Sequence, residues 1–154
     1  MKKLLVPIIF VISILSAFMV GKNFDKIQNH IITKNVEKDS KFDKLIYAIM
    51  MVESNGDNNA IGDKGKSIGC MQISKSVVDD VNRFSSVKYT YNDRYNRAKS
   101  IEIFKLYINH YATANRLGHE PTFEDIARIW NGGPNGYKKN ATKTYWVKVK
   151  NYLH

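Results

Sequence analysis

Apolar residues recur at helical spacing through most of the chain beyond residue 40, and this pattern predicts a mainly α-helical domain. The first stripe consists of Phe42, Ile46, Ile49, Met50 and Glu53. Its spacings of four, three, one and three residues place these side chains on one face of a helix. Ser40 with Asp43 resembles a capping box, so this helix is expected to begin near Ser40 and to stop at Gly56.

The same pattern predicts further helices separated by polar loops. They are expected over residues 75–84, from Asn92 or Asp93 to Gly118, from Thr122 to the NGGP segment at 131–134, and over residues 142–153. Ser74 and Thr122 are the expected N-caps of two of them. Residues 54–69 are rich in glycine and asparagine and predict a loop or a short hairpin.

The N-terminus has the pattern of an export signal. Lys2 and Lys3 precede a stretch without charge from Leu4 to Gly21. This stretch is long for a signal peptide, slightly short for a spanning helix, and lacks a clear small-x-small cleavage site. We interpret residues 1–21 as a cleaved signal or as a membrane anchor through residues 4–20, and favour the anchor. Residues 22–39 would then be a polar stalk, and residues 40–154 an exported domain, periplasmic or extracellular.

Composition and charge narrow the function only slightly. The chain has 154 residues and a net charge of +10, which favours partners such as nucleic acid, anionic membranes or anionic cell-wall polymers. The export pattern argues against nucleic acid. Cys70 is the only cysteine, so the chain cannot form an internal disulfide. The histidines lack metal-ligand spacing, so we expect neither a metal nor another cofactor.

Glu53 is the residue whose position indicates chemistry. It continues the apolar stripe one turn beyond Ile49 and Met50, so we expect its carboxylate to be partly desolvated and its pKa to be raised. An acid that stays protonated near neutral pH is suited to protonate a glycosidic oxygen. The alternative from the residues alone is an ordinary glutamate at a helix end that turns into solvent.

Three segments in order along the chain resemble the soluble lytic transglycosylase (SLT) domain, which is related in fold to goose-type lysozyme. ESNGDNNAIGDKGKSIGCMQI at 53–73 resembles its Glu-Ser and Gly-Leu-Met-Gln-Ile signature, with Cys70 in place of leucine. ARIWNGGPNG at 127–136 resembles its Ala-x-Tyr-Asn-x-Gly segment, with Trp130 in place of tyrosine. TYWVKV at 144–149 resembles a later segment with a tyrosine near the cleft. The resemblance covers residues 40–154 and implies a lysozyme-like helical fold.

This resemblance implies cleavage of the β-1,4 bond between N-acetylmuramic acid and N-acetylglucosamine in peptidoglycan. Glu53 would act as the acid and then as the base toward the muramoyl 6-hydroxyl, giving a 1,6-anhydro product. The side chains implied to bind the glycan strand are Ser67, Met71, Gln72, Trp130, Asn131 and Tyr145. Trp130 suits core packing equally well, and Tyr145 could orient Glu53 instead. For a small exported enzyme, the resemblance also suggests a role beside a secretion, conjugation or phage machine.

A second resemblance is to the invertebrate-type (destabilase) lysozymes. NGGPNG followed by T-x-x-Y-W-x-x-V, together with an Asp-x-Gly before the Gln-Ile pair, matches their pattern. In this alternative Asp63 assists Glu53 in hydrolysing the same bond. Asp63 before Lys64 and Gly65 also suits a plain turn, which we favour from the residue types. A non-catalytic wall-binding module is the third alternative, and the joint presence of Glu53, Gln72 and Asn131 argues against it.

Overall fold

Helices dominate the structure, a computed structural model that describes the backbone of residues 5–153 and the side chains of residues 26–153. The α-helices are α1 (Leu5–Ser54), α2 (Lys75–Phe84), α3 (Arg97–Tyr111), α4 (Ala114–Leu117), α5 (Phe123–Gly132) and α6 (Lys143–Lys150). The 3-10 helices are η1 (Asp63–Gly65), η2 (Tyr91–Tyr95), η3 (Gly136–Lys138) and η4 (Asn140–Thr142). The strands are β1 (Ile61–Gly62), β2 (Ser67–Ile68) and β3 (Ile73–Ser74). The predicted mainly α class is confirmed.

The chain divides into two units, residues 1–42 and residues 43–154. In the first unit, α1 runs through the stretch predicted to be a stalk, and Ser40 lies inside the helix. The predicted capping box at Ser40 is therefore wrong. Glu37 and Lys41 form an ion pair of 2.6 Å one turn apart, and such pairs of good helix formers support a helix across an intervening serine.

The predicted export segment, residues 1–21, lies outside the residues whose side chains the structure describes. Among the helices in the described part of the chain, none combines the length and the apolar character needed to cross a membrane.

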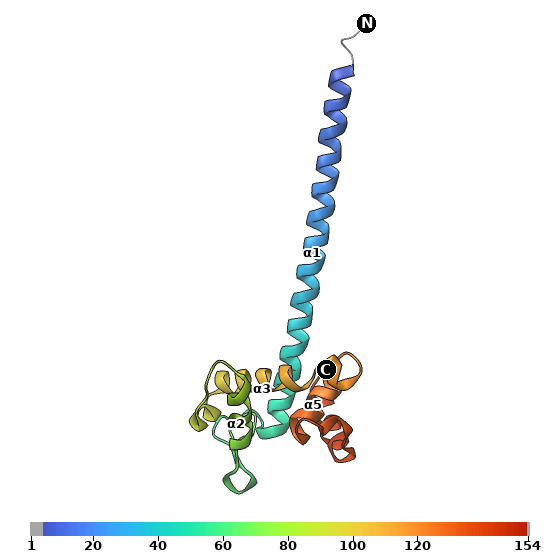
Figure 1. Cartoon of the computed structure of the whole chain (residues 1–154). Helices are drawn as coiled ribbons and strands as arrows, with labels where there is room; N and C mark the ends of the chain where they lie inside the picture. Colours follow the sequence, from blue (N-terminus) through green and yellow to red (C-terminus); the bar gives the residue numbers. More distant parts are fainter. Residues whose placement is uncertain (1–4, 154) are drawn as a thin grey trace. The chain divides into compact units, whose positions relative to one another are not determined.

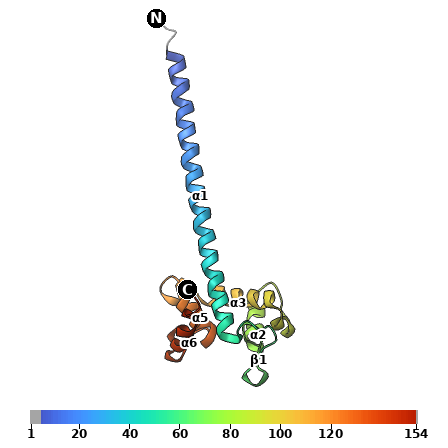
Figure 2. The same cartoon turned by 180° about the vertical axis from the view of Figure 1, so that it is seen from behind.

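The last part of α1, residues 43–54, is the central helix of the second unit. Figures 1 and 2 view this unit from opposite sides, and both show α2 on one side of it and α5 and α6 on the other. Its buried side chains are Leu45, Ile46, Ala48, Ile49 and Met50. The predicted stripe is confirmed, although the buried face is wider than the stripe because helices pack on both sides. Each large aliphatic side chain buried here contributes about 1.5–3 kcal/mol to stability.

A small antiparallel sheet follows α1. Asn55 and Gly56, with φ of 56° and 77°, turn the chain out of the helix in the left-handed region, so Gly56 stops the helix as predicted. The strands pair in the order β1-β2-β3, with Ile61 opposite Ile68 and Ile68 opposite Ile73. The loop predicted over residues 54–69 therefore contains a hairpin, which carries its turn away from the helices.

Two further predicted helices, besides α1, have different bounds in the structure. Helix α3 begins at Arg97 instead of Asn92 or Asp93, because the Asn96 side chain accepts the Lys99 N–H at 3.1 Å and caps the helix there. Gly118, predicted to end this helix, ends the separate short helix α4. Helix α6 covers Lys143–Lys150 instead of residues 142–153.

The predicted N-caps of α2 and α5 are confirmed. Ser74 accepts the Val77 N–H at 3.4 Å, and Thr122 accepts the Asp125 N–H at 3.2 Å. These caps satisfy backbone donors that the first turn of each helix leaves without intrahelical partners.

A buried arginine holds the segment between α5 and α6. Arg128 Nε donates to Thr142 Oγ1 at 3.1 Å, and its Nη2 donates to the Lys139 carbonyl at 3.2 Å. Gly136 lies against the same helix, where an added Cβ would be 1.9 Å from the Arg128 carbonyl oxygen. The segment can therefore close onto α5 only with glycine at this position.

We expect Gly136→Ala to destabilise the protein by about 3 kcal/mol, because the clash is with backbone that cannot move aside. Gly65→Ala is the matched control. Its added Cβ meets nothing within 4 Å, and only the left-handed backbone opposes it, at about 1 kcal/mol. Urea unfolding of the two variants measures the difference. Equal costs would contradict the packing argument.

Candidate active site

A cleft of about 740 Å³ lies beside the end of α1. Among the residues that line it are the predicted site residues Glu53, Asp63, Ser67, Gln72, Trp130 and Asn131. They come from α1, the β1–β2 hairpin, the segment before β3, and the end of α5. The fold thus gathers into one cleft residues that are far apart in the sequence.

Glu53 lines this cleft and is half-buried, and this partial burial determines its chemistry. Burial raises its pKa to about 7, and the negative charge of Asp63 acts in the same direction. The Tyr145 and Trp130 side chains act against this rise as hydrogen-bond donors. The Tyr145 hydroxyl donates to Glu53 Oε1 at 2.7 Å. The structure thus agrees with the predicted desolvation of Glu53. In addition, the Tyr145 hydroxyl is a fixed hydrogen-bond donor to one of its carboxyl oxygens.

Tyr145 is a buried residue on α6 and remains a donor at any physiological pH. Burial, and then the neighbouring Glu53, raise the pKa of its hydroxyl well above the ordinary value. Its role in the structure is to hold the Glu53 carboxyl group in one orientation.

The residue after Glu53 fixes the end of α1 to the chain before β3. Ser54 Oγ donates to the Cys70 carbonyl oxygen at 3.0 Å. Cys70 is fully buried, and its thiol plays no part in this bond. The Glu-Ser pair therefore combines an acid in the cleft with an anchor behind it.

Gln72 is held in the cleft wall by backbone carbonyls. It has a φ of 48°, and its Nε2 donates to Gly69 O at 2.9 Å and to Ala60 O at 3.3 Å. An added Cβ on Gly62 would lie 2.1 Å from Gln72 Oε1. The side chain can occupy this position only because residue 62 is glycine.

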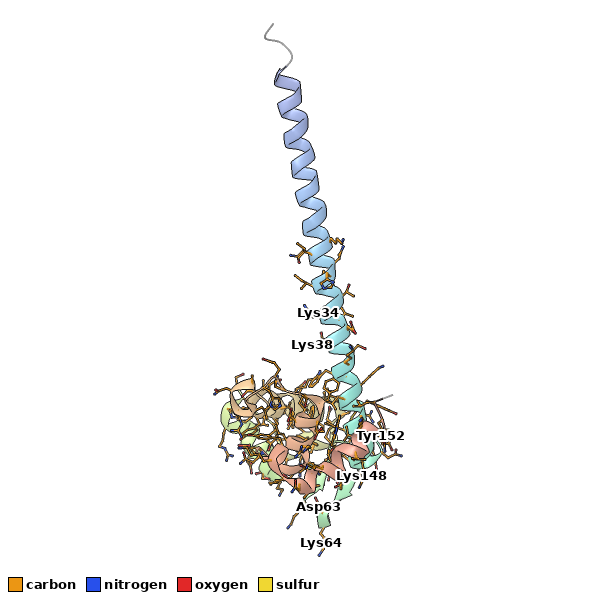
Figure 3. All side chains as sticks on the ribbon, turned by 90° about the vertical axis from the view of Figure 1, so that its right-hand side faces the viewer. Lys34, Lys38, Asp63, Lys64, Lys148 and Tyr152 are labelled. Carbon is orange, nitrogen blue, oxygen red and sulfur yellow. The ribbon has the colours of Figure 1, made fainter. Side chains whose placement is uncertain are left out.

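Asp63 lies in the predicted turn and also lines the cleft. It lies in the hairpin turn with Lys64, with left-handed φ of 49° and 57°, and Figure 3 shows both residues at the outer end of the hairpin. It also lines the cleft, and its Oδ2 accepts a hydrogen bond of 2.6 Å from Ser67 Oγ. The turn thus places a second carboxylate in the cleft and fixes its orientation.

Trp130 packs in the core, as one of its two predicted roles requires, and also reaches the cleft. Its ring packs edge-on against Phe104 and Tyr107, with centroid distances of 4.9 and 5.7 Å, and one part of the side chain lines the cleft. Asn131 follows it at the exposed end of α5. A flat indole beside an amide suits a sugar ring with an acetamido group, since one contact is apolar and the other is polar.

Met71 and Tyr145 are predicted substrate-binding residues that do not line the cleft. Met71 is fully buried, and Tyr145 is buried with its hydroxyl on Glu53. Cleft residues that the sequence analysis did not identify include Asp80 and Arg83 on α2 and Tyr107 on α3. Asp80 and Arg83 share a helix face with Ser76, and this spacing could have indicated a common wall. In the part of the chain that the structure describes, no three acidic, histidine or cysteine side chains are grouped to hold a metal ion.

Comparison with known proteins identifies this arrangement. Residues 30–153 match the sequence profile of the transglycosylase SLT domain family. A lysozyme from Ostrea edulis is 36% identical over 89 residues, which cover 56% of this chain and 62% of that protein. The chain thus matches less than two thirds of the length of this curated relative.

Solved structures show the same fold. The chain is similar to the structure of Aeromonas hydrophila PliI in complex with Meretrix lusoria lysozyme, with a TM-score of 0.60 and 27% identity over 70% of this chain and 87% of the other. Tapes japonica lysozyme gives a TM-score of 0.58 and 25% identity over 70% of this chain and 86% of the other. The fold is therefore a lysozyme-like domain, as predicted. The chain belongs to the transglycosylase SLT domain family.

The raised pKa of Glu53 predicts a stability that depends on pH. The folded state favours the protonated acid, with a pKa of about 7 against 4.5 for a glutamate in water. This contribution to stability is therefore complete below about pH 4.5 and is lost as the pH rises through about 7. We expect Glu53→Gln to be more stable than the wild type by about 3 kcal/mol at pH 8, and nearly equal to it at pH 4.

Urea unfolding at the two pH values tests this expectation. Glu120→Gln is the control, since Glu120 is exposed and its replacement should change the free energy of unfolding by less than about 0.5 kcal/mol at either pH. A Glu53→Gln effect that is the same at pH 4 and pH 8 would contradict the buried-acid description.

Proposed function

We propose that this protein cleaves the β-1,4 bond between N-acetylmuramic acid and N-acetylglucosamine in peptidoglycan, with Glu53 as the general acid. The observation that carries the proposal is the half-buried carboxyl group of Glu53, which lines the cleft and has a pKa of about 7. At neutral pH about half of the molecules hold the proton that the glycosidic oxygen must receive. Membership of the SLT family supports the same bond as the target.

The first chemical step follows from these positions. Glu53 gives its proton to the glycosidic oxygen while the bond from that oxygen to muramoyl C1 breaks, and N-acetylglucosamine leaves with a free 4-hydroxyl. Positive charge then develops at C1 and the ring oxygen. The carboxylate left on Glu53 accepts the Tyr145 hydrogen bond, which stabilises its new charge.

The cleft favours water as the group that attacks C1, which is the lysozyme reaction. Glycosidases that use water employ a second carboxylate, either as a base or as a nucleophile. Asp63 provides a carboxylate in the same cleft, held by Ser67. The similarity to lysozymes from Ostrea edulis and Tapes japonica supports this choice.

The second candidate is the lytic transglycosylase reaction, which the SLT family match favours. The 6-hydroxyl of the same muramoyl residue attacks C1, Glu53 takes the hydroxyl proton, and a 1,6-anhydro ring forms. This reaction requires no second carboxylate, because the nucleophile belongs to the substrate. Asp63 would then serve only the hairpin turn.

We propose that this reaction takes place outside the cytoplasm. The charged N-terminus and the apolar stretch from Leu4 to Gly21 support export of the domain. Peptidoglycan lies on that side of the membrane, and the net charge of +10 suits an anionic wall.

Product analysis separates the two reactions. We expect the wild-type protein to release reducing-end muropeptides from purified peptidoglycan, and the Glu53→Gln protein to release none.

Asp63→Asn keeps an acceptor for Ser67 and should lower kcat/KM at least about 100-fold, because it removes the second carboxylate. Asp57→Asn is the control, since Asp57 is an exposed loop acid outside the lining of the cleft. Anhydromuramoyl products with an active Asp63→Asn protein would assign the transglycosylase reaction instead, and no products from the wild type would overturn the proposal.

Tyr145→Phe should shift the pH dependence of cleavage. The hydrogen bond from Tyr145 lowers the Glu53 pKa, so its loss raises that pKa further and keeps the acid protonated to higher pH. We expect the alkaline limb of the kcat/KM profile to move up by less than about one pH unit, with a reduced maximum. Tyr152→Phe is the control, because Tyr152 is exposed near the C-terminus (Figure 3). A downward shift would be the contrary outcome.

A further inference from the structure

Helix α2 contributes several residues to the lining of the cleft, beside the acidic residues Glu53 and Asp63 that other elements contribute. Ser76, Asp80 and Arg83 all line the cleft, and their spacings of four and three residues place them on one face of the helix. From Ser76 to Arg83 this face extends about 10 Å along the helix axis. The cleft therefore has a second region, in which Asp80 and Arg83 are the charged residues.

Arg83 is positioned by its neighbours but remains available. Its Nη2 bonds to Asp80 Oδ1, while the other Asp80 oxygen, Oδ2, accepts a hydrogen bond of 2.6 Å from the Tyr111 hydroxyl. The Asp80 side chain is only 15% exposed, whereas the Arg83 side chain is 72% exposed. Asp80 is thus a fixed anchor, and the guanidinium presents its remaining N–H donors to solvent in the cleft.

Charge makes Arg83 different from the rest of the cleft. Among the described residues that line the cleft, it is the only basic one, and the other charged ones are Glu53, Asp63 and Asp80. An anionic ligand group would be repelled elsewhere in the cleft and attracted only here. A planar guanidinium is also the donor whose geometry best fits a carboxylate.

Peptidoglycan supplies such a group beside its sugars. The glycan backbone with its acetamido groups is neutral, and the muramoyl lactyl group is joined to the peptide stem through an uncharged amide. The free carboxylates belong to the stem, which leaves the muramoyl ring at the side of the strand. A strand with its scissile bond at Glu53 can thus place a stem along the wall formed by α2.

We propose that Arg83 binds a carboxylate of the peptide stem and makes the protein select glycan strands that carry acidic stems. This inference rests on the proposed function, because it takes peptidoglycan as the substrate. It adds a residue that determines specificity and that touches the stem instead of the reacting atoms. Asp80 is its positioning residue, held in turn by Tyr111.

The test compares soluble peptidoglycan fragments that carry acidic stems with the same fragments after chemical amidation of their carboxylates. Calorimetry with the Glu53→Gln protein measures the Kd of both without turnover, and wild-type cleavage of both is followed in parallel. We expect the acidic fragments to bind about tenfold more tightly. Adding Arg83→Gln should remove this ratio while leaving the Kd for the amidated fragments unchanged, and Arg83→Lys should restore part of it.

Lys148→Gln is the matched control, because it removes one positive charge from α6, where Lys148 is exposed outside the lining of the cleft (Figure 3). It should keep the tenfold ratio. A ratio that persists in Arg83→Gln, or a loss of affinity that is equal for both fragments, would overturn the proposal for Arg83. Absence of cleavage together with a ratio that depends on Arg83 would overturn the proposed function and leave the binding role standing.

Discussion

The hydrogen bond from Tyr145 to Glu53 joins α6 to the end of α1 across 92 residues of sequence, and the organisation of the cleft depends on it. A carboxyl group buried without a partner would turn toward solvent or lose its fixed orientation, because desolvation of its charged form is costly. Tyr145 supplies the partner only if α6 packs correctly. That packing depends in turn on the segment from Gly133 to Thr142, which Arg128 and Gly136 hold against α5. The acid and its orientation are thus properties of the whole second unit.

The same burial that suits Glu53 to acid chemistry makes the native fold less stable at alkaline pH. The large side chains that precede it on the same stripe of α1, such as Ile46 and Ile49, are buried and offset this penalty. Their stripe is also what identifies Glu53 in the sequence. Glu53 can therefore continue an apolar stripe and still be suited to acid chemistry. The apolar neighbours that stabilise the helix also raise the pKa of its carboxyl group.

Local patterns predicted much of this fold, and contacts between distant segments account for what they missed. The stripe on α1, the stop at Gly56 and the caps at Ser74 and Thr122 each depend on residues within one or two turns. The apolar spacing did not predict the residue at which α3 begins, because a cap at Asn96 and a start at Asn92 both fit that spacing. The spacing of Ser76 and Arg83 indicates a shared helix face, but it does not show that this face lines the cleft, since that depends on how α2 packs against β3 and α3. The prediction that Met71 binds substrate was wrong for a related reason. Its neighbour Gln72 lines the cleft, whereas the Met71 side chain lies in the core.

The hydrogen bond from Ser54 to the carbonyl oxygen of Cys70 requires only the backbone of residue 70. The side chain at this position can therefore vary without affecting the bond. The anchor of the acid-bearing helix is a main-chain atom, which every amino acid possesses. The side chain has only to fill a small buried space. Mutational drift at this position is therefore tolerated among small and medium apolar residues, and a cysteine can replace leucine within the signature without any effect on the bond that secures the acid. Sequence signatures of this kind record some positions for their side chains and others only for the path of the backbone.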